Sequence, residues 1–192
     1  MYDAISTLAE VEKGDAVIVT DVGQNQMFSA RYSKFNSTRS FITSGGLGTM
    51  GFGLPAALGA KLGVPDREVV CVMGDGGFQM TMQELGTIMQ NRIGVKMIVL
   101  NNSYLGMVRQ WQELFYDRRY SFTEMVNPDF GLIARGNGLS YRCVERREEL
   151  DEAIAAMKAS EGAFLLEVRV EGEENIFPMV PAGAPVSEIR FE

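Results

Sequence analysis

The stretch "VVCVMGDGGFQM" at residues 69–80 decides the fold, because an apolar run stops abruptly at a glycine-rich turn. The run has the continuous apolar character of a strand that is buried on both faces of a parallel sheet. Gly74, Gly76 and Gly77 then predict a tight turn whose backbone N–H groups can cradle a phosphate. A carboxylate at Asp75 would repel that phosphate, so the turn requires a separate role for Asp75.

Strands and helices alternate along the rest of the chain. Apolar runs predict strands at 16–20, 40–44, 68–73, 95–100, 140–144 and 163–170. Helical spacing predicts helices at 4–11, 54–63, 78–91, 106–115, 128–138 and 147–160. The alternation predicts a three-layer α/β/α fold with a parallel sheet of about six strands.

Glycine- and asparagine-rich loops follow four of these strands. In parallel sheets, ligands bind at the carboxyl ends of strands, near a switch in strand order. All four loops should open on that edge, which predicts a binding site there. Their sequences are "DVGQN", "GGLGTMG", "GDGG" and "NNSYLG".

Composition restricts the function classes. The 192 residues are 46% hydrophobic, which fits a single domain spanning 1–192. A net charge of −7 without basic runs argues against nucleic acid, and no apolar run reaches the roughly 20 residues of a membrane helix. The absence of histidine excludes Ser-His-Asp catalysis and His-ligated zinc. Cys71 and Cys143 predict reduced core thiols and a cytoplasmic location.

Asp75 and the pair Asn101-Asn102 each lie just past the end of a strand. If the two strands are neighbours, these side chains meet and offer carboxylate, amide and backbone oxygens, the ligands that Mg²⁺ prefers. Mg²⁺ held by Asp75 could then bridge to a phosphate, which explains the carboxylate. Two structural alternatives stay open: Asp75 as a helix N-cap and the asparagines as an ordinary capped turn.

Gly46-x-Gly48-x-x-Gly51 after a strand matches the dinucleotide-binding fingerprint when taken literally. This rival predicts an NAD-binding domain that needs no Mg²⁺. The structural alternative is that these glycines only allow close packing of a helix on the sheet. A non-catalytic interaction module is a further alternative.

The spacing Gly74-Asp75-Gly76, 24 residues, then Asn101-Asn102 resembles the motif of enzymes that use thiamin diphosphate (ThDP). The flanking stretches "TSGGLGTMGFGLPAALGA", "LNNSYLGMVRQWQELFY" and "NPDF" resemble the catalytic large subunit of acetolactate synthase, also called acetohydroxyacid synthase. The resemblance runs from about Ile5 onward and covers only that family's C-terminal, diphosphate-binding domain.

The resemblance implies the roles of individual residues. Asp75, Asn102 and the Tyr104 carbonyl would hold Mg²⁺. Met107, Val108 and Trp111 would lie near the substrate. Plain core packing is the alternative for Met50, Met107 and Trp111. The implied cofactor-binding residues are Gly23, Gln24, Asn25, Gly48, Met50, Gly74, Gly76, Gly77, Asn102, Gly106 and Met107.

The family decarboxylates pyruvate and condenses the product with a second 2-ketoacid, pyruvate or 2-ketobutyrate, in branched-chain amino acid biosynthesis. Its activating glutamate lies on an N-terminal domain and its FAD on a middle domain; Glu84 is interpreted as structural. We therefore expect an excised or truncated domain that folds but does not catalyse alone; a split enzyme stays open. The resemblance also implies a homodimer and a possible regulatory small subunit.

Two points qualify the resemblance. This chain has Gln24-Asn25 where the family usually has Gln-His, and an asparagine amide can still donate to a phosphate. Another ThDP enzyme, such as an oxidase, a decarboxylase or a different carboligase, is the nearest alternative.

Overall fold

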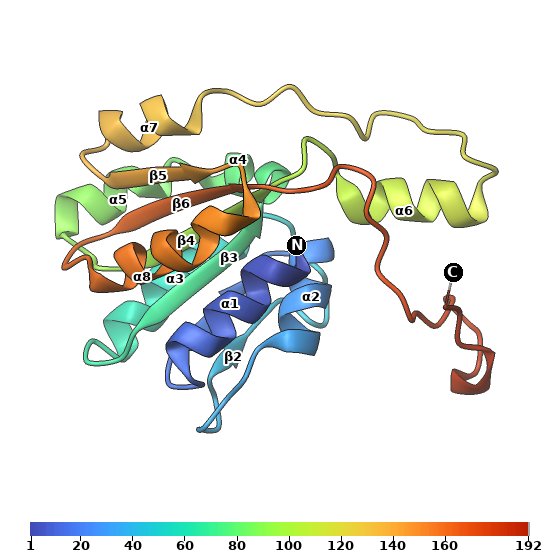
Figure 1. Cartoon of the computed structure of the whole chain (residues 1–192), viewed down its shortest axis with the longest axis horizontal. Coiled ribbons are helices and arrows are strands. Elements are labelled where there is room, and N and C mark those ends of the chain that lie inside the picture. Colours follow the sequence, from blue (N-terminus) through green and yellow to red (C-terminus); the bar gives the residue numbers. More distant parts are fainter. Residues whose placement is uncertain (192) are drawn as a thin grey trace.

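The computed structural model describes residues 1–191 and has a six-stranded, all-parallel sheet with helices on both faces (Figure 1). The predicted α/β fold is confirmed. The strands are β1 (Val17–Thr20), β2 (Phe41–Ile42), β3 (Val69–Gly74), β4 (Lys96–Asn101), β5 (Ser140–Val144) and β6 (Phe164–Arg169). The α-helices are α1 (Tyr2–Glu12), α2 (Gln24–Tyr32), α3 (Gly53–Gly63), α4 (Asp75–Thr81), α5 (Glu84–Asn91), α6 (Gly106–Phe115), α7 (Phe130–Gly136) and α8 (Leu150–Ala159).

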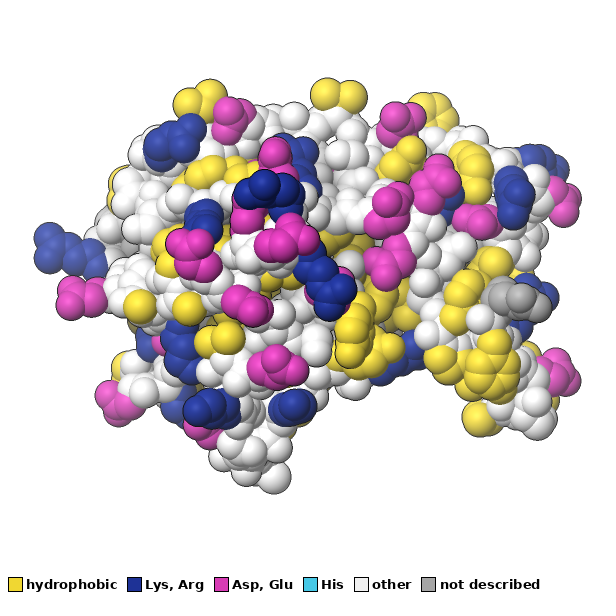
Figure 2. Space-filling model, in the orientation of Figure 1, with side chains coloured by type: hydrophobic (Ala, Val, Ile, Leu, Met, Phe, Trp, Pro, Cys, Tyr) yellow, Lys and Arg dark blue, Asp and Glu magenta, His cyan; other side chains and the backbone are white. Residues whose placement is uncertain are grey.

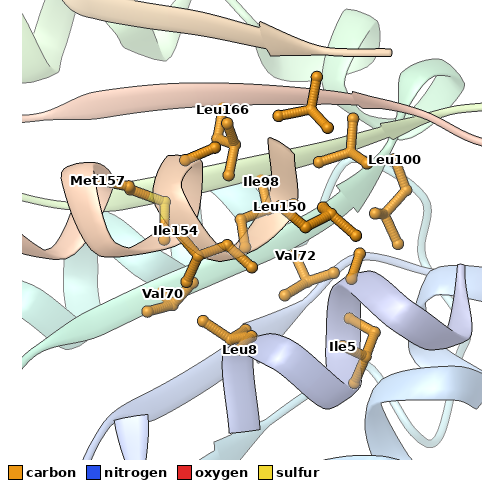
Figure 3. Close-up of a cluster of buried hydrophobic side chains, with 14 of the residues drawn as sticks. Ile5, Leu8, Val70, Val72, Ile98, Leu100, Leu150, Ile154, Met157 and Leu166 are labelled. Atoms are coloured by element: carbon orange, nitrogen blue, oxygen red, sulfur yellow. The ribbon is translucent and has the colours of Figure 1, made fainter. Parts of the chain in front are cut away.

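The central strands are apolar throughout because each face packs against a different helical layer. On β3, Val70 and Val72 face the cluster formed with α1, α2 and α8, whereas Val69 and Cys71 face α3, α5 and α7. Figure 3 shows the first cluster, in which Leu8 and Ile154 approach the sheet from two different helices. This double burial explains why the strands lack polar alternation.

Four elements differ from the sequence predictions. Helix α2 was not predicted, because it buries Gln24, Asn25 and Ser29 and so lacks an apolar stripe. The single helix predicted over 78–91 is two helices, α4 and α5, which are separated at Met82-Gln83. Strand β2 has only two residues instead of five. The helix predicted from 147 begins with a 3₁₀ turn over Arg147–Glu149.

The strand order β2-β1-β3-β4-β6-β5 places the switch in direction between β1 and β3. Strands β3 and β4 are neighbours, with Gly74 paired to Leu100, so the two turns that follow them are adjacent. Helix α6 lies beyond the carboxyl edge of the sheet (Figure 1). The topology therefore brings the predicted loops to one edge, next to a switch point.

Figure 2 shows basic and acidic side chains interspersed over one face of the molecule. Within residues 1–191, none of the helices is both long enough and apolar enough to cross a membrane.

Candidate functional site

A cavity opens at the carboxyl edge of the sheet. The loops after β1, β3 and β4 supply most of its wall, and Met50 comes from the loop before α3. The predicted site residues that line it are Gly23, Gln24, Asn25, Met50, Gly74, Asp75, Gly76, Gly77, Asn102, Tyr104, Gly106, Met107 and Val108.

Two predicted residues lie outside this cavity. Gly48 is in the loop before α3, with φ at 63°, and does not line the wall. Trp111 is 38% exposed and lines a neighbouring hollow on α6, together with Met107 and Val108. Its ring packs on Phe115 at a centroid distance of 5.1 Å. Met107 and Val108 line both hollows.

Three helices begin at the cavity: α2 at Gln24, α4 at Asp75 and α6 at Gly106. The first N–H groups of a helix have no partner within the helix, and the helix dipole places partial positive charge there. Convergence of these ends favours an anionic group such as a diphosphate.

Asp75 is the first residue of α4 and is only 1% exposed. Its Oδ2 accepts hydrogen bonds from the Ser103 backbone N–H at 2.9 Å and from Asn127 Nδ2 at 2.6 Å. Burial raises the pKa of this carboxyl, and those hydrogen bonds oppose the rise. A buried carboxylate without a cationic partner in its contacts is the setting in which a bound cation is stabilised.

Asn102 lies 6% exposed at the end of β4, on the neighbouring turn. Its Oδ1 accepts from the Tyr104 backbone N–H at 3.1 Å. The Asp75 carboxylate, the Asn102 amide oxygen and the Tyr104 carbonyl would offer a bound ion oxygen donors only. Such a set suits Mg²⁺, which keeps some positions for water or phosphate oxygens.

Three buried polar atoms at the cavity have no hydrogen-bond partner among the described residues: Gln24 Oε1, Asn25 Oδ1 and Asn102 Nδ2. Buried polar atoms are normally paired, which leaves these three atoms open to a bound water or ligand. Asn102 Nδ2 can donate to a phosphate oxygen, and the two amide oxygens can accept from a polar ligand. Together with the oxygen donors at Asp75, this arrangement fits ThDP and Mg²⁺.

Three glycines of the cavity wall, Gly76, Gly77 and Gly106, have no space for a side chain. A Cβ on Gly76 would lie 2.7 Å from Leu105 Cδ2, and a Cβ on Gly106 would overlap Gln24 Oε1. The backbone at these positions therefore forms the wall itself, as a phosphate cradle requires.

Two residues near the cavity, Asp21 and Asn127, were not predicted from the sequence. Asp21 is fully buried at the end of β1, and its carboxylate accepts from Gly51 N at 3.1 Å and Gly53 N at 2.8 Å. It thereby fixes the loop that carries Met50. Its position directly after a strand is the same signal that identified Asp75. The second, Asn127, comes from a distant loop, and no local pattern indicated its contact with Asp75.

Glu84, interpreted as structural, is the first residue of α5 and accepts from Thr87 Oγ1 at 2.9 Å. Asp75 is not an N-cap, because Gly74 holds that position. Cys71 is buried in β3, Cys143 is half-buried in β5, and both are free thiols, as predicted.

The cavity at this edge of the sheet, with three helix N-termini around it, is typical of the class of α/β domains that bind a phosphate group at the carboxyl ends of parallel strands. The chain belongs to the family described as thiamine pyrophosphate enzyme, C-terminal TPP binding domain, whose model matches residues 21–168. This membership does not favour the dinucleotide-binding alternative.

The chain is similar to several large subunits of acetolactate synthase. It is 45% identical over 186 residues to the isozyme 2 large subunit of Escherichia coli (strain K12), covering 96% of this chain and 34% of that protein. It is 44% identical over 188 residues to the large subunit of Lactococcus lactis subsp. lactis (strain IL1403), covering 97% and 32%. It is 48% identical over 171 residues to that of Parasynechococcus marenigrum (strain WH8102), covering 88% and 28%. The chain thus spans about a third of the length of these relatives.

Proposed function

We propose that this chain is the ThDP- and Mg²⁺-binding domain of an acetolactate synthase, which joins pyruvate to a second 2-ketoacid after decarboxylation. The observation that carries the proposal is that Asp75 and Asn102 line the same cavity as Gly74, Gly76 and Gly77, together with buried polar atoms that have no partner. The similarity to acetolactate synthase large subunits supports the choice within ThDP enzymes.

Each group of residues has a role in this proposal. Asp75, Asn102 and the Tyr104 carbonyl hold the metal ion, and the backbone of Gly76 and Gly77 donates to the diphosphate. Met50, which lines the cavity, would contact the bound cofactor. When bound, ThDP supplies the carbon nucleophile for the 2-ketoacid, while the protein binds and orients the reactants.

Substrate selection is assigned to the second hollow. Met107 and Val108 lie between the two hollows, and Trp111 is the large side chain beside them. We assign to Trp111 the discrimination between pyruvate and 2-ketobutyrate, which differ by one methylene group. Discrimination of that size is worth about 1–3 kcal/mol.

The proposal includes wider properties of the enzyme. The chain is one domain of a longer enzyme, with the activating glutamate and an FAD site on other domains, so it is inactive alone. A homodimer, a regulatory small subunit and a cytoplasmic location belong to the same proposal; the unpaired state of Cys71 and Cys143 supports the location.

The test is a hybrid in which this chain replaces the matching third of the E. coli isozyme 2 large subunit. We expect acetolactate from pyruvate with the hybrid and none with the 192-residue chain alone. Asp75→Ala should abolish product formation, whereas the control Glu84→Ala should not. Release of acetaldehyde or acetate instead of acetolactate would favour a decarboxylase or an oxidase.

A further inference from the structure

Asn127 joins the candidate metal site to the rest of the fold, although its loop is remote from β3 in sequence. Its Nδ2 donates to Asp75 Oδ2 at 2.6 Å and to Asn101 Oδ1 at 2.9 Å. Its own Oδ1 accepts from Gln79 Nε2 at 2.8 Å. The contact with Gln79 determines which end of the amide faces the carboxylate, so Asn127 can act on Asp75 only as a donor.

The partner of Asn127 on β4 is itself held in place. Asn101 is 2% exposed, and its Nδ2 donates to the buried Glu167 on β6 at 2.7 Å. Glu167 also accepts from Tyr141 Oη at 2.6 Å and pairs with Arg169 at 2.9 Å. Hydrogen bonds thus connect Tyr141 on β5, Glu167 on β6 and Asn101 on β4 to Asn127. The sheet therefore holds the Asn127 side chain in place.

The segment that carries Asn127 is also fixed by its backbone. Leu105 N donates to Thr123 O at 2.7 Å, and Met125 N donates to Ser103 O at 2.8 Å. These contacts lay the segment antiparallel along the turn that follows β4, with Tyr104 bridged to Glu124. This backbone pairing places the side-chain amide of Asn127 beside Asp75.

We propose that Asn127 is a positioning residue of the metal site, which holds the Asp75 carboxylate in the orientation that binds Mg²⁺. The two hydrogen bonds to Oδ2, with the further backbone contact of Gly76 to the carboxylate, fix the orientation of the group. Groups that orient a ligating carboxylate typically change metal affinity by about 10- to 100-fold when removed. This inference rests on the proposed function, because it takes Asp75 as a metal ligand.

A positioning role differs from a structural role in its effect on metal selectivity. Mg²⁺ demands near-ideal octahedral geometry, whereas Ca²⁺ accepts flexible, irregular coordination. Loss of orientation at Asp75 should therefore weaken Mg²⁺ more than Ca²⁺. A general loosening of the domain would weaken both ions alike.

The experiment titrates the 192-residue chain with MgCl₂ and, separately, with CaCl₂, each in the presence of ThDP, by calorimetry. The variants are Asn127→Ala and the control Asn137→Ala, whose side chain is also half-buried but donates to Ile133 O at 2.9 Å and not to Asp75. We expect Asn127→Ala to weaken Mg²⁺ by about 10- to 100-fold and Ca²⁺ by less. Asn137→Ala should bind both ions like the unsubstituted chain.

Unchanged Mg²⁺ affinity in Asn127→Ala, or equal losses for Mg²⁺ and Ca²⁺, would overturn the positioning role and leave the proposed function intact. Failure of the unsubstituted chain to bind Mg²⁺ with ThDP would contradict both. If Asn127→Ala does not fold, Asn127→Ser serves instead, because it retains one short donor and should show the same selectivity change. In the unsubstituted chain, the side-chain amide NMR signal of Asn127 should also shift on adding Mg²⁺ with ThDP.

Discussion

The carboxylate of Asp21 occupies the space that a side chain at position 77 would need, since a Cβ built on Gly77 would overlap Asp21 Oδ1. The same carboxylate accepts hydrogen bonds from Gly51 and Gly53. One buried side chain thus joins the end of β1, the loop that carries Met50 and the turn after β3. Contact with Asp21 therefore constrains the turn at Gly77, whether or not a ligand is bound.

Gly77→Ala should destabilise the fold, because the added methyl group must displace a carboxylate that is fully buried. Overpacking of this kind costs about 1–3 kcal/mol. The measurement is the free energy of unfolding in urea.

Gly86→Ala on α5 is the matched control for this prediction, because a Cβ there meets no atom within 4 Å. An alanine at this helical position should stabilise the chain by about 0.4–1 kcal/mol. Equal effects of the two substitutions would contradict the close contact between Asp21 and Gly77.

Asp21→Asn should loosen the loop of residues 43–52. Both carboxylate oxygens accept backbone N–H groups, so the amide necessarily presents a donor to one of them. An unsatisfied buried group of this kind costs about 1–3 kcal/mol. We expect a lower unfolding free energy together with faster amide exchange at Gly51 and Gly53, measured by NMR; unchanged exchange would show that Asp21 does not hold this loop.

Tyr141→Phe should make the free energy of unfolding fall less steeply as pH rises in the alkaline range. Burial, followed by the hydrogen bond to Glu167, raises the pKa of the Tyr141 hydroxyl above its usual value of about 10. Above that pH the unfolded chain releases this proton and the folded chain keeps it, so stability falls as pH rises. Removing the hydroxyl removes this component of the slope.

The measurement is the urea midpoint between pH 9 and 11.5 for the unsubstituted chain, for Tyr141→Phe and for Tyr116→Phe, whose ring is 55% exposed. Tyr116→Phe should follow the unsubstituted chain. Identical slopes for all three proteins would count against the contact between Tyr141 and Glu167.

Gln110→Leu should make the segment around Ile176 more mobile. Gln110 Nε2 donates to Ile176 O and its Oε1 accepts from Ile176 N, both at 3.1 Å. The same Oε1 accepts from Gln24 Nε2, so the substitution also removes one of the two hydrogen bonds that this cavity-wall amide donates, the other being to Glu174 O. Hydrogen exchange of residues 174–179 should accelerate, and exchange that stays slow would show that other contacts hold this segment.

Gln112→Leu is the control for this helix, because Gln112 bonds to the backbone of Ser121 and not to the segment around Ile176. Exchange over residues 174–179 should be the same as in the unsubstituted chain.

The sequence indicated the sheet and most of the cavity wall because both depend on short patterns. The turns at Asp75 and Asn102 are adjacent once β3 and β4 pair, which strand neighbours usually do. Helix α2 was not predicted, because a helix that buries the polar residues Gln24 and Asn25 lacks apolar periodicity. The contact of Asn127 with Asp75 was not predicted, because no local sequence pattern indicates a contact between residues 52 positions apart.

The most direct test of the central claim is a calorimetric titration of the 192-residue chain with ThDP, with and without Mg²⁺, for the unsubstituted chain and for Asp75→Ala. The account predicts binding heat only when Mg²⁺ and Asp75 are both present. Binding that persists in Asp75→Ala, or that needs no Mg²⁺, would contradict a diphosphate site bridged by a metal ion on Asp75.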